Sequence, residues 1–332
     1  MPEEIVQPSN IRKNLKILIV TIFLLMLANF TVYFSGALKN LDSGVFLIQH
    51  KWNLLYNLDS PVEWLILGDS SANQGVNTEV LRSANGGQAL NLGTVGNTLL
   101  IEDVWMLQSY IEAHGAPNNV VIVHVYDMWA RQADTSVFAH VPWSRMSGTD
   151  MFSSVREQAE LLWYKYIPLY QSDTQIFRAI SNPLNMFTPP IYVNDDGFTR
   201  VDDPNPSLVS KDINNHSTKI LTKQFQVSPT NSIAIEMLVN LANKHDLDVF
   251  IANSPIHEDL AHKESFSEYF KHVSDLLKEI DHASINIHYV LQETPKFDST
   301  MMENVDHVTI KGSEIFTSKL ISEIDNYRSN QQ

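Results

Sequence analysis

The 332-residue sequence contains no cysteine and few basic residues. The lack of cysteine excludes disulfide bonds, thiolate metal sites and cysteine nucleophiles, but it leaves the compartment open because disulfide-free proteins occur everywhere. Only 23 Lys and Arg stand against 38 Asp and Glu, so the net charge is −15. No basic cluster follows the first turns of the chain, and we therefore expect no nucleic acid among its partners.

Two further kinds of site lack their sequence signatures. Histidines such as His257 and His262 do not have the spacing of metal ligands and fit surface helices better, so we expect no metal. Gly93 and Gly96 follow the second expected strand, and the first glycine of a dinucleotide fingerprint is missing. We therefore expect no cofactor.

What the sequence does contain is one long apolar run. Residues 17–38 carry no charge, and most of them are Ile, Leu, Val, Phe or Ala. About 20 such residues span a bilayer as a helix. Small residues at 35–37 would also suit a signal peptidase, but the run is longer than the roughly 7–15 apolar residues of a signal peptide. The sequence therefore favours a retained single-pass anchor in the cytoplasmic (inner) membrane.

The charges before this run predict its orientation. Arg12, Lys13 and Lys16 lie just ahead of the apolar residues. By the positive-inside rule, residues 1–16 stay in the cytoplasm and everything after about Lys39 lies outside it, in a periplasmic or other extracytoplasmic space.

The rest of the chain alternates between strand-like and helix-like patterns. Strands rich in Val and Ile are expected over 62–67, 89–92, 120–126, 247–252 and 285–291. Helices are expected over 101–114, 231–245, 265–280 and 313–328. Such alternation predicts a parallel sheet covered on both faces, here a three-layer α/β/α, flavodoxin-like fold with five strands.

The domain boundaries follow from the same patterns. Residues 39–61 are typical of a short amphipathic stem, and the domain itself is expected over 62–328. Residues from about 133 to 228 interrupt the alternation with prolines, aromatics and one expected helix at 153–166. This insertion is either a lid or substrate wall over the sheet edge, or a structural excursion that packs its aromatics on the core.

Chemistry-bearing residues follow three of the expected strands. Gly68, Asp69 and Ser70 end the first strand, where a serine is either a nucleophile or simply the cap of the next helix. A glycine-containing loop over 91–98 follows the second strand. His307 lies in the loop before the last helix, at the same carboxyl edge, where it could serve as general base to the serine.

In this order the three motifs resemble the SGNH (GDSL-like) hydrolase superfamily. Residues 68–70 match its Gly-Asp-Ser block, Asn91 to Thr98 match its second block, and His307 matches the histidine of its last block. The resemblance covers roughly 62–130 and 245–328. It implies that Ser70 attacks an ester with His307 as base, while the backbone N–H groups of Ser70 and Gly96 bind the oxyanion.

The sequence departs from this family at two positions. Tyr126 stands where the third block has an oxyanion-binding Asn, and Asn73 or Asn97 could stand in for it. One missing donor can cost about 10²–10³ in rate.

The second departure concerns the group that orients the histidine. Asn304 takes the place of the expected Asp three residues before His307. The neighbouring Asp306 would have difficulty reaching the ring of His307 unless the loop bends, and Asp298 is another option. The catalytic set implied by the resemblance is therefore Ser70 and His307, with Asn304 or Asp306 as orienting residue.

An outward-facing anchored domain of this kind is similar to the DltD-like proteins that work beside membrane-bound O-acyltransferases. The resemblance implies acyl transfer to, or ester cleavage from, an exported polysaccharide or a teichoic-acid-like acceptor. Two alternatives stay open. One is a degenerate binding subunit on the same fold, and the other is a structural component whose membrane helix, with Asn29, Thr31 and Ser35, is its main functional surface.

Overall fold

A five-stranded parallel sheet forms the centre of the molecule. The computed structural model describes residues 8–35, 39–142, 152, 154–167 and 173–331. The strand order is β2-β1-β3-β4-β6, with every neighbouring pair parallel. The strands are β1 (Trp64–Gly68), β2 (Ala89–Asn91), β3 (Asn119–His124), β4 (Val249–Asn253) and β6 (Ile287–Tyr289). This order is the flavodoxin-like one, and it confirms the predicted parallel sheet.

Alternate residues of the central strands belong to two separate hydrophobic cores. In β1, Leu65 and Leu67 contribute to one buried cluster, whereas Trp64 and Ile66 contribute to the other. Successive side chains of a strand point to opposite faces. A strand whose residues are all apolar must therefore be covered on both sides, as the sequence pattern predicts.

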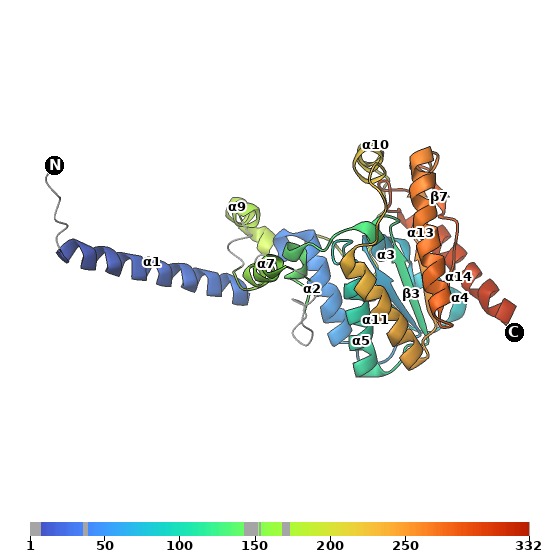
Figure 1. Ribbon diagram of the computed structural model, residues 1–332, viewed down its shortest axis with the longest axis horizontal. Coiled ribbons are helices and arrows are strands. Elements are labelled where there is room, and N and C mark those ends of the chain that lie inside the picture. The colour runs from blue at the N-terminus through green and yellow to red at the C-terminus, as the bar shows by residue number, and fades with distance from the viewer. Residues whose placement is uncertain (1–7, 36–38, 143–151, 153, 168–172, 332) are drawn as a thin grey trace.

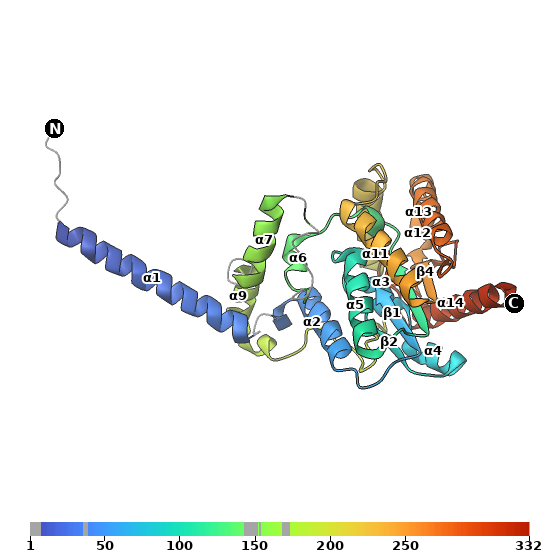
Figure 2. The ribbon, with the colours of Figure 1, turned by 60° about the horizontal axis from the view of Figure 1, so that its bottom comes forward.

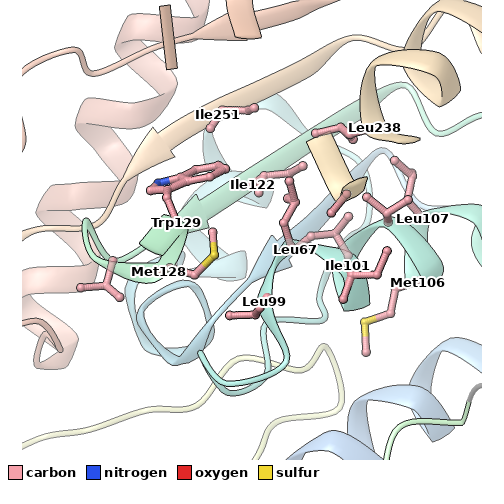
Figure 3. Packing of buried hydrophobic residues seen from close by; sticks show 14 of the residues in the cluster. Leu67, Leu99, Ile101, Met106, Leu107, Ile122, Met128, Trp129, Leu238 and Ile251 are labelled. Carbon is pink, nitrogen blue, oxygen red and sulfur yellow. The ribbon is translucent and has the colours of Figure 1, made fainter. Parts of the chain in front are cut away.

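Helices cover both faces of the sheet, which makes three layers (Figure 1, Figure 2). One face carries α2 (Ser43–Tyr56), α5 (Leu99–His114), α11 (Pro229–His245) and α13 (Glu264–Ala283). The other carries α3 (Ser70–Gly75), α4 (Thr78–Asn85) and α14 (Ile310–Gln331). Figure 3 shows the first core, where Ile122 of β3 and Ile251 of β4 pack near Leu238 of α11.

Helix α2 differs from the stem that the sequence predicts over 39–61. Its side chains Ile48, Trp52 and Leu55 are at most 2% exposed and belong to the first core. The Trp52 indole donates to Glu102 of α5 at 2.8 Å. Residues 43–56 are amphipathic, as the sequence predicts, but their apolar face packs into the first core, so they are part of the folded domain.

Helix α1 (Pro8–Ser35) projects away from the domain (Figure 1). Its segment Arg12–Phe34 is long and apolar enough to cross a membrane, and none of its most apolar stretch is buried. Asn29 donates to the backbone carbonyl of Tyr166, 2.9 Å away, at the end of α7 (Val155–Tyr166). The hydroxyl of Thr31, a second polar side chain of this helix, donates to the backbone carbonyl of Leu27.

The insertion is mainly helical in its described parts. After 3-10 helix η2 (Met128–Ala130) come α6 (Thr135–Phe138), α7, α9 (Asp173–Ser181), η4 (Pro183–Met186), α10 (Pro206–Asn215) and the π-helix η5 (His216–Ile220). The remaining short elements are η1 (Lys39–Leu41), β5 (Ile256–His257), α12 (Glu258–Ala261) and β7 (Lys296–Phe297).

One stretch of the insertion, residues 194–205, connects separate parts of the sheet edge. Backbone hydrogen bonds join Asp196 to Asn91, Thr199 to Asn73 and Val201 to Ile310. Lys51 of α2 is fully buried and donates to Asn73, Asn91 and Gly197. This stretch therefore packs between α2, α3, the end of β2 and the start of α14, and it serves a structural role.

Candidate active site

The turn after β1 places a serine at the start of a helix. Gly68 has φ +133°, and a Cβ there would collide with the carbonyl oxygen of Val123, so this position requires glycine. Asp69 caps α3 by accepting from the backbone N–H of Ser71 at 2.8 Å. Because Asp69 is the cap, the hydroxyl of Ser70 is not needed for that purpose.

The Ser70 hydroxyl lies against the imidazole of His307. The Oγ of Ser70 and Nε2 of His307 are 2.7 Å apart, although the two residues are separated by 237 positions in the chain. Ser70 follows β1 and His307 precedes α14, so both lie at the carboxyl edge of the sheet. The structure thus brings together the two residues that the sequence singles out, at the distance expected for a nucleophile and its base.

Asp306 reaches the other nitrogen of the same ring. Its Oδ1 lies 2.8 Å from Nδ1 of His307. The difficulty expected from sequence is removed by the loop itself. The side-chain oxygen of Asn304 accepts from the backbone N–H groups of Asp306, at 3.0 Å, and His307, at 2.8 Å, and bends the chain. An isolated bridge between Met302 and Val308 closes the loop.

Asn304 therefore shapes the loop, and Asp306 supplies the carboxylate. The Asn304 oxygen also lies 3.0 Å from Nδ1 of His307, so both candidates for the orienting residue contact the ring. With Nδ1 donating its proton to these oxygens, Nε2 is left to accept a hydrogen bond from Ser70. Asp298, the third candidate, instead accepts from the backbone and hydroxyl of Thr300 and does not take part.

The electrostatics of this pair favour an ionised carboxylate. Burial lowers the pKa of His307, but the charge and hydrogen bond of Asp306 outweigh burial and raise it above 6.5. Burial raises the pKa of Asp306, and the His307 charge more than reverses this effect, so the net pKa is well below 3.8. Asp306 is thus ionised at neutral pH and stabilises the imidazolium that forms when His307 takes a proton.

Two backbone N–H groups at the site, those of Ser70 and Gly96, have no hydrogen-bond acceptor among the described residues. Asn91 joins the start of the loop that contains Gly96 to α3, because its amide donates to the carbonyls of Ala72 and Val76 at 2.9 and 3.0 Å and its side-chain oxygen accepts from the backbone N–H of Gly93. Both donors that the resemblance assigns to the oxyanion are therefore free to bind one.

Of the side chains considered at the missing third-block donor, Tyr126 and Asn73 have partners elsewhere, whereas Asn97 has none among the described residues. The hydroxyl of Tyr126 lies 2.7 Å from Nδ1 of His216 in the insertion, and its ring packs edge-on against Phe266. The side-chain oxygen of Asn73 accepts from buried Lys51. The side chain of Asn97 is exposed and makes no hydrogen bond with the described residues.

Sequence reasoning missed a buried charge cluster directly behind the serine. His124 at the end of β3 lies 2.7 Å from Asp103 and 3.5 Å from Asp69, and all three are nearly inaccessible. Burial lowers the pKa of His124, but the two carboxylates outweigh it and raise the pKa to about 9. The signal was the adjacent acids Glu102 and Asp103, which lie within the apolar first turns of the helix.

Across the residues that are described, no group of three or more His, Asp or Glu side chains is arranged to hold a metal ion.

The chain matches no protein-family model and no curated protein. Several solved structures, including the following two, resemble it distantly. One is a protein from Streptococcus pneumonia provisionally described as a platelet activating factor, with 10% identity, a TM-score of 0.37, and coverage of 84% of this chain and 92% of the other. The second is a family two carbohydrate esterase from Clostridium thermocellum, with 12% identity, a TM-score of 0.35, and coverage of 81% and 66%. Both TM-scores are below 0.5, so the function proposed next depends on the geometry of the site.

Proposed function

We propose that this protein is a serine acyltransferase or esterase of the SGNH type. The observation that supports the proposal is the hydrogen-bonded chain Ser70–His307–Asp306, with distances of 2.7 and 2.8 Å. These three groups have the order and spacing of nucleophile, base and orienting acid. The uncommitted N–H groups of Ser70 and Gly96 supply the complementary donors.

In the proposed reaction, Ser70 Oγ attacks the carbonyl carbon of an ester while its proton passes to Nε2 of His307. The tetrahedral oxyanion is bound by the N–H groups of Ser70 and Gly96, at the positive end of α3. Collapse expels the alcohol, which takes the proton from His307 and leaves an acyl-serine. An acceptor hydroxyl then attacks the acyl-serine and gives its proton to His307, and collapse expels Ser70 Oγ, which takes that proton back. A sugar hydroxyl gives transfer, and water gives hydrolysis.

The location is also part of the proposal. Arg12, Lys13 and Lys16 lie in the first turns of α1, just before its uncharged apolar residues, which supports a cytoplasmic N-terminus and a domain outside the membrane. A domain tethered there would meet exported or envelope polysaccharides. A membrane-bound O-acyltransferase would be the partner that delivers the acyl group, and a polysaccharide or teichoic-acid-like polymer would accept it.

A degenerate binding subunit is the second candidate, and Tyr126 is the observation that favours it. Its hydroxyl is committed to His216, so the family's third oxyanion donor is missing from its usual position. The other objection, the lack of an acid three residues before His307, is met by Asp306.

A fluorophosphonate probe separates the two candidates, using the full-length chain in detergent. We expect the wild type to be labelled at one residue and Ser70→Ala to be unlabelled. Ser71→Ala is the matched control, because Ser71 is the adjacent serine, is buried, and its hydroxyl has no partner among the described residues. An unlabelled wild type, or labelling that persists in Ser70→Ala, contradicts the proposed enzyme.

If labelling occurs at Ser70, p-nitrophenyl acetate with and without soluble glucan or chitin oligosaccharides tests the class of reaction. Acetylated oligosaccharide in excess over free acetate indicates transfer, and acetate alone indicates hydrolysis.

A further inference from the structure

A charged side chain that the sequence pattern does not predict, that of Arg131, lies beside the proposed oxyanion site. Arg131 follows η2, immediately beyond the segment that contains Tyr126. Its Nε and Nη2 donate to the carboxylate of Asp127 at 3.1 and 2.8 Å. A guanidinium held by two parallel bonds has a defined plane and orientation. The position of the third nitrogen, Nη1, is therefore set by the backbone of the same short turn.

This third nitrogen lies over Gly96. A Cβ built on Gly96 would collide with Nη1 of Arg131, and the same Cβ would be 3.7 Å from the Cβ of Asp69. Nη1 makes no hydrogen bond within the described part of the chain. Gly96 is thus needed for close approach of the guanidinium, in addition to the N–H that it contributes to the site.

The positive charge of Arg131 contributes to lowering the pKa of two carboxyl groups near Ser70, those of Asp69 and Asp306. Burial raises the pKa of Asp69 and Asp306, but the charges around them, including that of Arg131, lower it below 3.8 in both cases. Asp69 directly precedes Ser70, and Asp306 orients His307. The guanidinium therefore contacts the second-block glycine and is close enough to lower the pKa of the carboxylates that neighbour Ser70 and His307 in the chain.

We propose that Nη1 of Arg131 is the third donor of the oxyanion hole, taking the place of the side-chain amide that Tyr126 cannot supply. This inference rests on the proposed function. When Ser70 attacks an ester carbonyl, the oxyanion accepts from the N–H groups of Ser70 and Gly96 and from Nη1. No proton is transferred from the guanidinium, which stays charged throughout.

This arrangement explains the salt bridge to Asp127. The Asp127 side chain is 5% exposed, so the carboxylate is held near the guanidinium in a partly desolvated place. It orients the donor and offsets most of its charge in the resting enzyme. A hydrogen bond from an ionised donor to a developing oxyanion is stronger than one from a neutral amide, so one guanidinium N–H suffices where the family uses an Asn.

The test measures the second-order rate of fluorophosphonate labelling at Ser70 in full-length protein, because the phosphonyl oxygen occupies the oxyanion site during that reaction. We expect Arg131→Ala to be labelled about 10²–10³-fold more slowly and Arg131→Lys to retain part of the rate. Guanidinium at tens of millimolar should restore labelling of Arg131→Ala. Arg82→Ala, which removes a 2.9 Å salt bridge to Asp196 away from Ser70, is the matched control and should keep the wild-type rate.

Gly96→Ala provides an independent variant that keeps the Arg131 charge but displaces Nη1. We expect it to slow labelling as well, and the double variant with Arg131→Ala to be no slower than Arg131→Ala alone, because both changes remove the same contact. Full additivity of the two effects would overturn the inference.

Three further results would contradict the proposed role of Arg131, and one would contradict the proposed function itself. Wild-type labelling rates in Arg131→Ala refute the role of Arg131 while leaving the proposed enzyme intact, whereas an unlabelled wild type refutes the proposed function itself. A lower melting temperature with no rescue by guanidinium assigns Arg131 a structural role only. A normal labelling rate with a raised KM for an anionic oligosaccharide acceptor alone shows that Arg131 binds the acceptor.

Discussion

His307 and His124 each lie 2.7–2.8 Å from an aspartate, yet they differ in almost everything else. His124 is 2% exposed and lies between Asp103 and Asp69, with the Trp129 ring edge-on against it. His307 has a side chain that is 17% exposed, one carboxylate at Nδ1 and a serine hydroxyl at Nε2. A buried imidazole between two carboxylates is held as a cation, whereas one between a carboxylate and a hydroxyl can exchange a proton.

The difference shows that a nearby carboxylate alone does not make a histidine a base. The second nitrogen must face a group that can give up a proton, and the ring must become neutral within the working pH range. His124, with a pKa near 9, stays protonated and joins Asp69 and Asp103 behind the Ser70 turn. Asp103 also accepts from the backbone N–H of Gly68 at 2.9 Å, so this cluster positions the turn. Four predictions test this difference between His307 and His124.

The largest expected effect is that of His307→Gln on catalysis. We expect kcat/KM for p-nitrophenyl acetate to fall about 10⁴–10⁶-fold, because the general base is lost. The free energy of unfolding should change by less than about 1 kcal/mol, because the site is partly exposed. Steady-state kinetics and urea unfolding measure the two quantities. A large loss of stability with residual activity near wild type would place His307 in the same class as His124.

Asp306→Asn should have the next largest effect, lowering kcat/KM about 10²–10⁴-fold. We expect kcat/KM of the wild type to rise with pH as His307 loses its proton, because its pKa is raised above 6.5. Without the carboxylate, burial lowers that pKa, so the rise should move to lower pH. A pH–rate profile that keeps its wild-type midpoint in Asp306→Asn would show that Asn304 is the residue that matters.

His124→Gln should act on stability. Removing the cation leaves the buried carboxylates of Asp69 and Asp103 with backbone N–H donors but without the imidazolium charge between them, which costs about 3–5 kcal/mol. Urea unfolding of the full-length chain in detergent measures this loss. Surface His282→Gln, whose ring bonds a backbone carbonyl at a helix end, is the control and should change little. A cost below about 1 kcal/mol would mean that the cluster is not charged.

The smallest effect is a pH dependence of stability. The folded pKa of His124, about 9, lies above its ordinary value of 6.5, so its protonation stabilises the folded state. This contribution is complete below pH 6.5 and is lost as pH rises through about 9. We expect the wild type to lose more stability between pH 6 and 9.5 than Asp103→Asn, in which the main charge partner of His124 is neutral. Parallel curves for the two proteins would contradict the prediction.

Several features were predictable from the sequence because they depend on local patterns. The strands were identified from continuous Val- and Ile-rich runs that only a doubly covered parallel sheet accommodates. The proximity of Ser70 and His307 was predictable because the carboxyl ends of parallel strands meet at one edge, and their side chains lie 2.7 Å apart. The apolar helix before residue 39 follows from composition alone.

Other features depend on partners that are distant in sequence. The role of Asp306 was underestimated because its reach depends on the bend that the Asn304 side chain imposes. Helix α2 was interpreted as a stem because an amphipathic pattern does not identify the surface that its apolar face covers. Arg131 was not singled out, since its relation to Gly96 exists only after two loops pack together.

By itself, then, the sequence determined the fold class and the candidate nucleophile and base. The pattern of apolar residues indicates which faces of each helix and strand are buried. Because the strands are parallel, their carboxyl ends lie at one edge of the sheet. Only the tertiary structure decided that Asp306 and Asn304, and not Asp298, contact the ring of His307, that His124 is buried between two carboxylates, and that the guanidinium of Arg131 lies against Gly96. The physical reason is that burial and hydrogen bonding, which set the charge and direction of these side chains, arise from contacts between segments far apart in the chain.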